Sequence, residues 1–286
     1  EEDGRSSHRI FDPVLHAGAL ARVHLESRLR VALEQEQMVL HYQPIVSMAT
    51  GEVTGFEALI RWEDPERGLV FPNDFIGVAE ETGLIIPIGW WGLEEACRQL
   101  KDWQVRFPRE EPISVGVNFS SLQFDQPDFY YQIEDRLTRF GLLPNSLHVE
   151  ITESSLMVYL EGIVQVLERL KARSVRLHID DFGTGYSSLS YLCRIPIHTL
   201  KIDRSFVVRM MESSADLEIV RTIVQLARNL DLSIIAEGVE TMAQLERLKE
   251  LGCDEAQGYF FSRAVGVEQV EALLAAESPP WPWAGR

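Results

Sequence analysis

The chain has 286 residues, 45% hydrophobic and 25% charged, a composition typical of a globular protein and not of a disordered or fibrous one. Its 27 basic and 44 acidic residues give a formal net charge of −17, which disfavours general DNA or RNA binding because like charges repel. No apolar stretch approaches the about 20 residues that span a bilayer, so we expect no transmembrane helix and no membrane contact from this segment, while upstream segments of a longer protein could still provide an anchor. Three cysteines without a C-x-x-C pair favour a reduced, cytoplasmic setting.

The N-terminal part of the chain predicts a connector, a helix and a hairpin. Residues 1–23 contain neither an initiator methionine nor a signal segment, and we interpret them as a connector from an upstream domain. Residues 24–36 carry apolar side chains at helical spacing and predict an amphipathic helix. Two β-rich runs, 38–46 and 53–62, are separated by a turn signal at 49–52 and predict an antiparallel hairpin.

Beyond the hairpin, β-like runs alternate with helix-length segments, which is typical of a βα repeat. The hairpin and the later runs make eight strands, and residues 24–277 match the about 250 residues of a (β/α)₈ TIM barrel. An open, doubly wound sheet is the alternative, because a strand count does not prove closure. The Pro/Trp-rich tail, 278–286, cannot continue a helix and is expected to be a surface appendage. The later predicted strands are 113–119, 147–152, 175–180, 198–203, 233–237 and 253–257, and the further predicted helices are 73–82, 88–106, 158–173, 215–230 and 241–251.

Polar residues stand at or near the end of each predicted strand. The carboxyl ends of barrel strands surround one pocket, so we expect these side chains to meet. Each one also has a simpler explanation: Asp180 and Asp181 before Gly183 suit a turn, and Lys201 suits an internal ion pair. The residues are Gln43, Glu57, Asn118, Glu150, Asp180, Asp181, Lys201, Asp203, Glu237 and Gln257.

Converging carboxylates repel one another unless cations neutralise them, so their convergence predicts a metal site. Carboxylate and amide oxygens suit Mg²⁺ or Mn²⁺, whereas the histidines show no zinc-type spacing. Five or more ligands exceed what one Mg²⁺ usually takes from protein, which favours two ions sharing a carboxylate. Such a pair promotes displacement at phosphorus, so the residues predict phosphoester hydrolysis, with Arg61 and Lys201 as nearby positive groups. They do not name the substrate.

Residues 56–62, Phe-Glu-Ala-Leu-Ile-Arg-Trp, resemble the signature of the EAL domain, the bacterial phosphodiesterases specific for cyclic di-GMP. The resemblance covers about residues 24–276. It implies a modified (β/α)₈ TIM barrel with one antiparallel strand, and cleavage of cyclic di-GMP to linear pGpG. The other matching motifs are YQPIV at 42–46, VNFS at 117–120, EITE at 150–153, DDFGTG at 180–185, LKID at 200–203, AEGVET at 236–241 and QGY at 257–259.

The resemblance also implies a role for each site residue. The first metal ion would take Glu57, Asn118, Glu150 and Asp180, and the second would take Asp180, Asp181 and Glu237. The catalytic group would be Lys201, which positions and helps activate the water, together with Glu237 and Gln257. Substrate contacts would come from Gln43, Arg61, Asp203, Glu240 and Tyr259. Glu153 would hold the glycine-containing loop, 181–188, which joins the metal site to a dimer interface.

The same resemblance implies several binding partners, and the sequence departs from the family pattern at one position. It implies two Mg²⁺ or Mn²⁺ ions, inhibition by Ca²⁺, a homodimer, and an upstream sensory or GGDEF domain. Ala264 replaces the usual proline before the last helix, which loosens that turn without touching a ligand. A receptor that binds cyclic di-GMP without hydrolysis is the alternative function. An Mg²⁺-dependent enzyme of enolase type is a third, but it does not account for Asn118 or for the glycine-containing loop.

Overall fold

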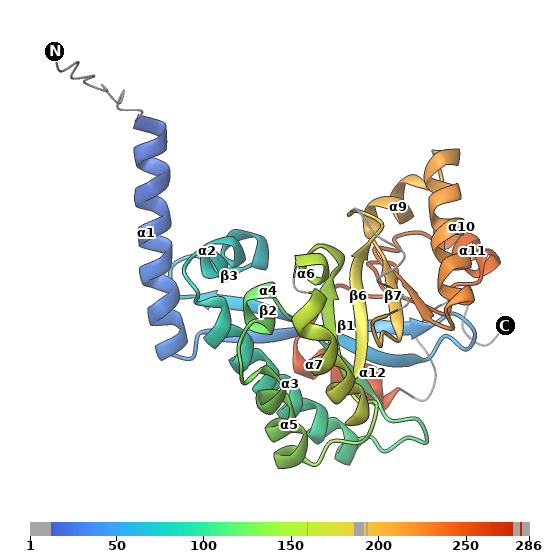
Figure 1. Cartoon of the computed structure of the whole chain (residues 1–286), viewed down its shortest axis with the longest axis horizontal. Coiled ribbons are helices and arrows are strands. Elements are labelled where there is room, and N and C mark those ends of the chain that lie inside the picture. The colour runs from blue at the N-terminus through green and yellow to red at the C-terminus, as the bar shows by residue number, and fades with distance from the viewer. Residues whose placement is uncertain (1–12, 159, 186–191, 193, 277–280, 282–286) are drawn as a thin grey trace.

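The computed structural model describes residues 13–158, 160–185, 192, 194–276 and 281 of the chain. Its strands form a closed eight-stranded barrel with helices around it, and α1 runs along one side with its first turns projecting beyond the body (Figure 1). The strands are β1 Met38–Ser47, β2 Val53–Asp64, β3 Gly68–Val70, β4 Ser114–Asn118, β5 Leu147–Thr152, β6 Arg176–Phe182, β7 Thr199–Ile202, β8 Ser233–Ala236 and β9 Glu255–Ala256.

The order of the barrel strands is β1-β9-β8-β7-β6-β5-β4-β2, and β1 also pairs with β2, so the sheet closes on itself. This closure confirms the predicted barrel and excludes the open sheet. Strand β1 is antiparallel to both β2 and β9, while the remaining barrel pairs are parallel, as the resemblance implies. The short strand β3, which the sequence did not predict, pairs with β2 outside the ring.

The helices flank the barrel, and most of the predicted ones are present with shifted ends. The predicted helix at 24–36 begins earlier, at Pro13, and the one at 158–173 corresponds to α7, Leu160–Ala172. Helix α11 begins after Thr241, whose hydroxyl accepts a hydrogen bond from the Gln244 backbone, as expected for an N-cap. The helices are α1 Pro13–Glu34, α2 Ile76–Glu81, α3 Ile85–Arg106, α4 Ser121–Phe124, α5 Phe129–Phe140, α6 Glu153–Val158, α7 Leu160–Ala172, α9 Arg204–Arg209, α10 Ser214–Asn229, α11 Met242–Leu251 and α12 Val267–Ala275, with a 3₁₀ turn, η1, at Pro72–Asp74.

Helix α5 was not predicted, because it begins with Phe129, Tyr130 and Tyr131, residue types that favour strands. Phe129 and Ile133 are buried, and the Phe129 ring packs against Trp90 of α3, so tertiary packing outweighs local propensity there. None of the helices in the described ranges is long and apolar enough to cross a membrane.

The C-terminal tail corrects one expectation. Trp281 is not on the surface, since only 7% of it is exposed and its indole N–H donates to the Gly51 carbonyl at 2.7 Å. Its ring also packs edge-on against Phe261. An aromatic side chain gains more from burial than from solvent exposure, so this residue docks against the barrel. The other tail residues, 278–280 and 282–286, lie outside the described residues.

Candidate active site

The candidate site is centred on Lys201, at the third position of β7. Side chains alternate along a strand, so Thr199 and Lys201 face the barrel interior while Leu200 and Ile202 pack against the surrounding helices. The Lys201 ammonium is completely buried and is surrounded by four carboxylates from four other parts of the barrel. The distances from its Nζ are 2.6 Å to Glu150, 2.7 Å to Glu237, 3.1 Å to Asp180 and 3.2 Å to Glu57.

Two side-chain amides complete the inner ring of this cluster. Asn118, at the end of β4, donates to Glu57 at 2.6 Å. Gln257, just after β9, donates one amide to Glu57 at 2.7 Å and to Glu237 at 2.8 Å. The structure therefore brings together residues from seven strands or strand ends that are separated by up to 200 positions in the sequence.

The carboxylates form two groups that could each hold a metal ion, within the described part of the chain. Glu57, Glu150 and Asp180 make one group, and Asp180, Asp181 and Glu237 make the other, with the ligand atoms of each group within 4.8 Å of one another. Asp180 belongs to both, as expected of a bridging carboxylate. Hard oxygen donors of this kind fit Mg²⁺ or Mn²⁺. The observed grouping thus fits the metal ions that the sequence predicted.

The ionisation of the cluster reflects its burial. Burial, together with Glu57 and Asp180, raises the pKa of Glu150 to about 8, and burial raises the pKa of Glu237 well above its usual value. Burial and the neighbouring Asp180 also raise the pKa of Asp181 to about 6. Without cations, the cluster therefore retains protons at neutral pH, and a bound divalent cation would displace them.

Two members of the cluster, Glu57 and Lys201, keep their charge because the interactions with their neighbours shift the pKa more than burial does. Burial disfavours the charged form of Glu57, but Lys201 and the amides of Gln257 and Asn118 together lower its pKa. Burial likewise disfavours the Lys201 ammonium, but the surrounding carboxylates raise its pKa well above the usual value. Lys201 is therefore a fixed positive charge within the site.

The segment after β6 has an unusual backbone. Asp181 has a φ of 53°, a left-handed conformation that non-glycine residues rarely adopt, and its N–H donates to the Asp180 carboxylate at 3.0 Å. Glu153, at the start of α6, accepts a hydrogen bond from the Gly183 N–H at 2.9 Å. Gly183 has a φ of 100°, and a Cβ there would lie 2.9 Å from Phe206. Residues 186–188 of the predicted loop lie outside the described residues.

A polar pocket of about 190 Å³ lies on one side of the cluster. It contains three of the five predicted substrate-contact residues, Gln43, Glu240 and Tyr259, together with Glu237 and Gln257 of the cluster. Gln43 is oriented by a hydrogen bond to the Ser262 carbonyl at 3.1 Å. The backbones of Tyr42 and Val265 exchange hydrogen bonds of 2.8 and 3.0 Å, which anchor the segment around Ala264.

Arg204 and Arg263 are residues of this pocket region that the sequence analysis missed. Arg204 lines the pocket and pairs with Glu240 at 2.6 Å. The guanidinium of Arg263 lies 4.1 Å from the centre of the Tyr259 ring, a cation–π contact. No local motif marks either residue, because their positions depend on the pairing of β7, β8 and β9.

The two remaining predicted substrate contacts lie outside that pocket. Arg61 is buried, its guanidinium lies 5.1 Å from the centre of the Phe71 ring, and its Nε has no partner within the described residues. Burial lowers the pKa of Arg61, while Glu57 and Tyr259 are close enough to oppose that shift. Asp203 accepts a hydrogen bond from Ser205 at 3.0 Å and so caps α9.

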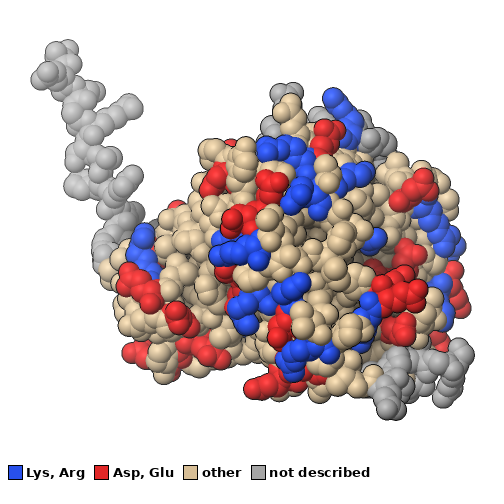
Figure 2. Space-filling view, turned by 90° about the horizontal axis from the view of Figure 1, so that it is seen from below, with Lys and Arg blue, Asp and Glu red and all other residues tan. Residues whose placement is uncertain are grey.

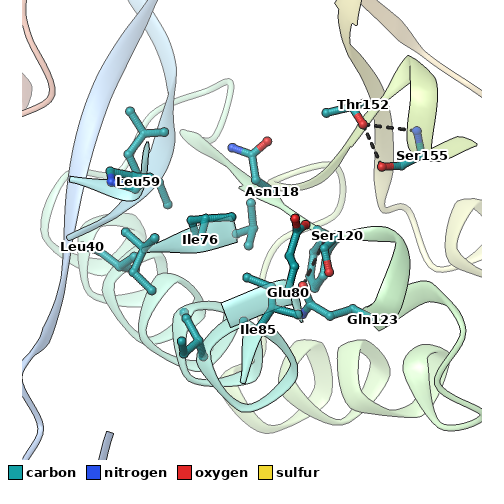
Figure 3. A pocket seen from close by; sticks show the side chains of 18 residues that line it. Leu40, Leu59, Ile76, Glu80, Ile85, Asn118, Ser120, Gln123, Thr152 and Ser155 are labelled. Carbon is teal, nitrogen blue, oxygen red and sulfur yellow. Dashed lines mark hydrogen bonds between the residues drawn. The ribbon is translucent and has the colours of Figure 1, made fainter. Parts of the chain in front are cut away.

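A second pocket, of about 300 Å³, lies on the other side of the cluster (Figure 3). Leu59 and Asn118 lie at this pocket, and Leu40, Ile76 and Ile85 give it a mainly apolar lining. Polar side chains stand at one end, where Ser120 and Gln123 make a capping box at the start of α4. The acidic cluster thus lies between a polar and an apolar pocket.

Comparison with known proteins agrees with this arrangement. Residues 26–264, most of the barrel, match the family described as the EAL domain. The chain belongs to the EAL domain family. The site described above therefore lies where the glutamate of the Glu57-Ala58-Leu59 motif meets the ends of the other barrel strands.

Two similar proteins come from Pseudomonas aeruginosa. The chain is 44% identical over 275 residues to the bifunctional diguanylate cyclase/cyclic di-GMP phosphodiesterase MucR, covering 96% of this chain and 40% of MucR. It is 41% identical over 273 residues to the cyclic di-GMP phosphodiesterase NbdA, covering 96% of this chain and 35% of NbdA. The chain thus spans about two fifths or less of the length of these relatives.

Solved structures of EAL domains have the same fold. The MucR phosphodiesterase in complex with cyclic di-GMP superposes with a TM-score of 0.83 at 46% identity, covering 86% of this chain and 99% of that one. The EAL domain of Mycobacterium smegmatis DcpA superposes with a TM-score of 0.72 at 36% identity, covering 83% of this chain and 97% of that one. The TIM-barrel-like fold of the EAL domain is therefore the fold of this chain.

Proposed function

We propose that this EAL domain hydrolyses cyclic di-GMP to linear pGpG with the help of two Mg²⁺ or Mn²⁺ ions. The main observation behind the proposal is that two clusters of three carboxylate residues share Asp180 and lie beside the buried Lys201. Relatives named as cyclic di-GMP phosphodiesterases support the choice of substrate. The proposed catalytic residues are Lys201, Glu237 and Gln257.

The charge of the site supports two ions rather than one. Five carboxylates and one ammonium, when ionised, leave four negative charges, which two divalent cations would neutralise. Glu57, Asn118, Glu150 and Asp180 would hold one ion, and Asp180, Asp181 and Glu237 the other. When bound, the two ions would polarise a phosphate group and lower the pKa of a bound water.

The residues of the chain orient the reacting groups. Lys201 is a fixed ammonium that donates hydrogen bonds into the cluster, where it positions the attacking water and stabilises negative charge. Gln257 keeps Glu57 and Glu237 in place through its two hydrogen bonds. The buried guanidinium of Arg61, with an Nε that has no partner in the described part of the chain, suits a phosphate oxygen.

The two pockets beside the cluster suit a dinucleotide with two bases. The apolar pocket at Leu59 suits the face of one planar base, and the polar pocket at Gln43, Glu240 and Tyr259 suits the hydrogen-bonding edge of the other. Asp203 would add a further polar contact at the start of α9. The phosphodiester between the bases would then face the carboxylates.

The proposal also covers inhibition by Ca²⁺, the oligomeric state and the upstream domain. Ca²⁺ would occupy the oxygen ligands with a looser geometry and inhibit turnover. We further propose a cytoplasmic homodimer, with Glu153 linking its interface to the metal site through Gly183. An upstream sensory or GGDEF domain is consistent with the greater length of the relatives.

The test is direct turnover. The domain is incubated with cyclic di-GMP and Mg²⁺ or Mn²⁺, and the products are separated by chromatography. We expect pGpG from the natural sequence, at least about 100-fold less from Asp180→Asn, and an unchanged rate from Asp125→Asn, because Asp125 is exposed and away from the cluster. A folded dimer that binds cyclic di-GMP without producing pGpG would contradict the proposal and establish a receptor instead.

A further inference from the structure

A third pocket, of about 290 Å³, lies at the end of the barrel opposite the acidic cluster. Its lining comes from the first residues of the parallel strands, including Thr54, Ser114 and Arg176, and from the last part of β1, which runs the other way. In Figure 2, the face seen from below carries basic and acidic side chains interspersed, although the chain as a whole has a net charge of −17. This pocket takes no part in the proposed hydrolysis.

Two histidines form the inner wall of this pocket. His148 and His178 are 6% and 2% exposed, and their ring centres are 4.3 Å apart. His148 contacts the Asn145 carbonyl through Nε2 at 3.1 Å. Its Nδ1 and both ring nitrogens of His178 have no hydrogen-bond partner within the described residues. The closest carboxylate oxygen to His178, on Glu150, is 3.8 Å away and so outside hydrogen-bond range.

Such ring nitrogens are costly to bury without a partner. An unsatisfied buried polar group costs about 1–3 kcal/mol, and here several lie together beside an open pocket. A molecule in the pocket that both accepts and donates hydrogen bonds would satisfy them. The arrangement therefore indicates a ligand and not only a packing defect.

The charges facing the histidines are mainly positive. Arg176 lines the pocket and forms no ion pair within the described ranges, and Lys201 and His198 add to the positive potential at His178. Of the two acids in the lining, Glu111 is exposed at the rim. Glu255 accepts a hydrogen bond from the Thr54 hydroxyl at 2.5 Å, and its carboxylate also interacts electrostatically with Arg176, so it offsets part of the positive charge at that side of the pocket. At His178 itself the neighbouring charges are positive, which favours an anion over a cation at that part of the wall.

A metal ion fits this pocket less well. His148 and His178 are part of no group of three potential metal ligands in the described part of the chain. The positive charge of Arg176 would also repel a cation. An arginine beside neutral imidazoles instead matches the way in which proteins bind phosphate and carboxylate groups.

We propose that this pocket is a second ligand site, which binds the phosphate or carboxylate group of a small metabolite between Arg176 and the pair His148 and His178. The anion accepts hydrogen bonds from the guanidinium and from an imidazole N–H, and the hydroxyls of Thr54 and Ser114 stand beside the remainder of the ligand. The site does not depend on the hydrolysis of cyclic di-GMP.

Binding can be measured on the metal-free domain without any activity assay. The ring nitrogens of His148 and His178 are followed by long-range ¹H–¹⁵N NMR during titrations with inorganic phosphate and, separately, with acetate. We expect a saturable shift of both rings, and the probe that saturates at the lower concentration identifies the group as a phosphate or a carboxylate. If neither probe gives a saturable shift, the proposal is wrong.

Variants locate the binding site. Arg176→Gln is expected to weaken binding about tenfold, because it removes a charged hydrogen-bond donor at an exposed position where folding is not at risk. Arg173→Gln is the matched control, since Arg173 lies in the preceding turn, faces Glu134 at 3.5 Å and is not in the pocket lining. Arg61→Gln, at the catalytic end, should also leave the titration unchanged. If Arg176→Gln and Arg173→Gln bind the probe with equal affinity, the ion is an adventitious ion only and the proposal is wrong. If Arg61→Gln loses affinity for the probe, the anion binds at the catalytic end of the barrel and the proposal is also wrong.

Discussion

Replacing Lys201 by methionine tests the centre of the proposed mechanism. The change keeps a long unbranched side chain but removes the ammonium that contacts Glu57, Glu150, Asp180 and Glu237 at 2.6–3.2 Å. Removing one partner of a buried ion pair costs about 3–5 kcal/mol, and we expect the metal-free variant to lose stability of that order at pH 8. At pH 5 the loss should be smaller, because Glu150, whose pKa is raised to about 8, then carries a proton.

The effect of Lys201→Met on turnover should be larger than its effect on substrate binding. Positioned groups that assist proton transfer contribute about 10²–10⁴-fold to a rate, so we expect kcat with saturating Mg²⁺ to fall by at least 100-fold. The affinity for cyclic di-GMP, measured with Ca²⁺ to prevent turnover, should stay within about threefold, because Lys201 does not line either substrate pocket.

The assay compares three proteins, with rates measured at one pH and stability measured at both pH 8 and pH 5. Initial rates of pGpG formation are measured by chromatography, and stability is measured by urea unfolding without divalent cations. Lys171→Met is the matched control, because Lys171 is an exposed lysine in the last turn of α7. A Lys201→Met rate within tenfold of the natural sequence, or an equal loss of rate and affinity, would refute the assigned role.

Three further predictions follow from the geometry. In the metal-free domain the folded-state pKa of Glu150 is about 8 and lies above its ordinary value of 4.5, so the folded state binds more protons than the unfolded state, and the free energy of unfolding should fall as pH rises from 4.5 to 8. Mg²⁺ should therefore raise the melting temperature more at pH 8 than at pH 5. An equal rise at both pH values would contradict this. Gly116→Ala should weaken Mn²⁺ binding at least about tenfold, because a Cβ there would lie 1.9 Å from the Glu150 carboxylate, whereas Gly92→Ala, with open space around its Cβ, should leave calorimetric Mn²⁺ titrations unchanged. Trp281→Ala should lower the free energy of urea unfolding by about 3 kcal/mol, and a loss below 0.5 kcal/mol would mean that the docked tail adds nothing to stability.

The site residues were predictable to the extent that they stand in strand-end motifs. Glu57, Glu150 and Asp180 each follow an apolar strand pattern, and the barrel brings such positions to one end. Arg204 and Arg263 were missed because nothing near them in the sequence marks a site, and they reach Tyr259 only after β7, β8 and β9 pair. His148 and His178 were visible only as single histidines.

The helices and the C-terminal tail also show that only locally determined features could be predicted from the sequence. The amphipathic periodicity of α10 and α11 is local, and their predicted ranges agree with the structure within a few residues. Helix α5 and the docking of Trp281 depend on surfaces supplied by other parts of the chain, so local propensity was misleading for both.

The sequence by itself determined the alternation of strands and helices, the family, and the residues that provide the carboxylates, because these follow from side-chain pattern and motif order along the chain. Only the tertiary structure decided that one lysine lies among four carboxylates and that Asp180 belongs to both metal groups. It also decided that a third pocket lies at the opposite end, beside histidine ring nitrogens that have no hydrogen-bond partner within the described residues. The physical reason is that distances between strands are set by closure of the barrel, which joins β1 to β9 through contacts far apart in sequence.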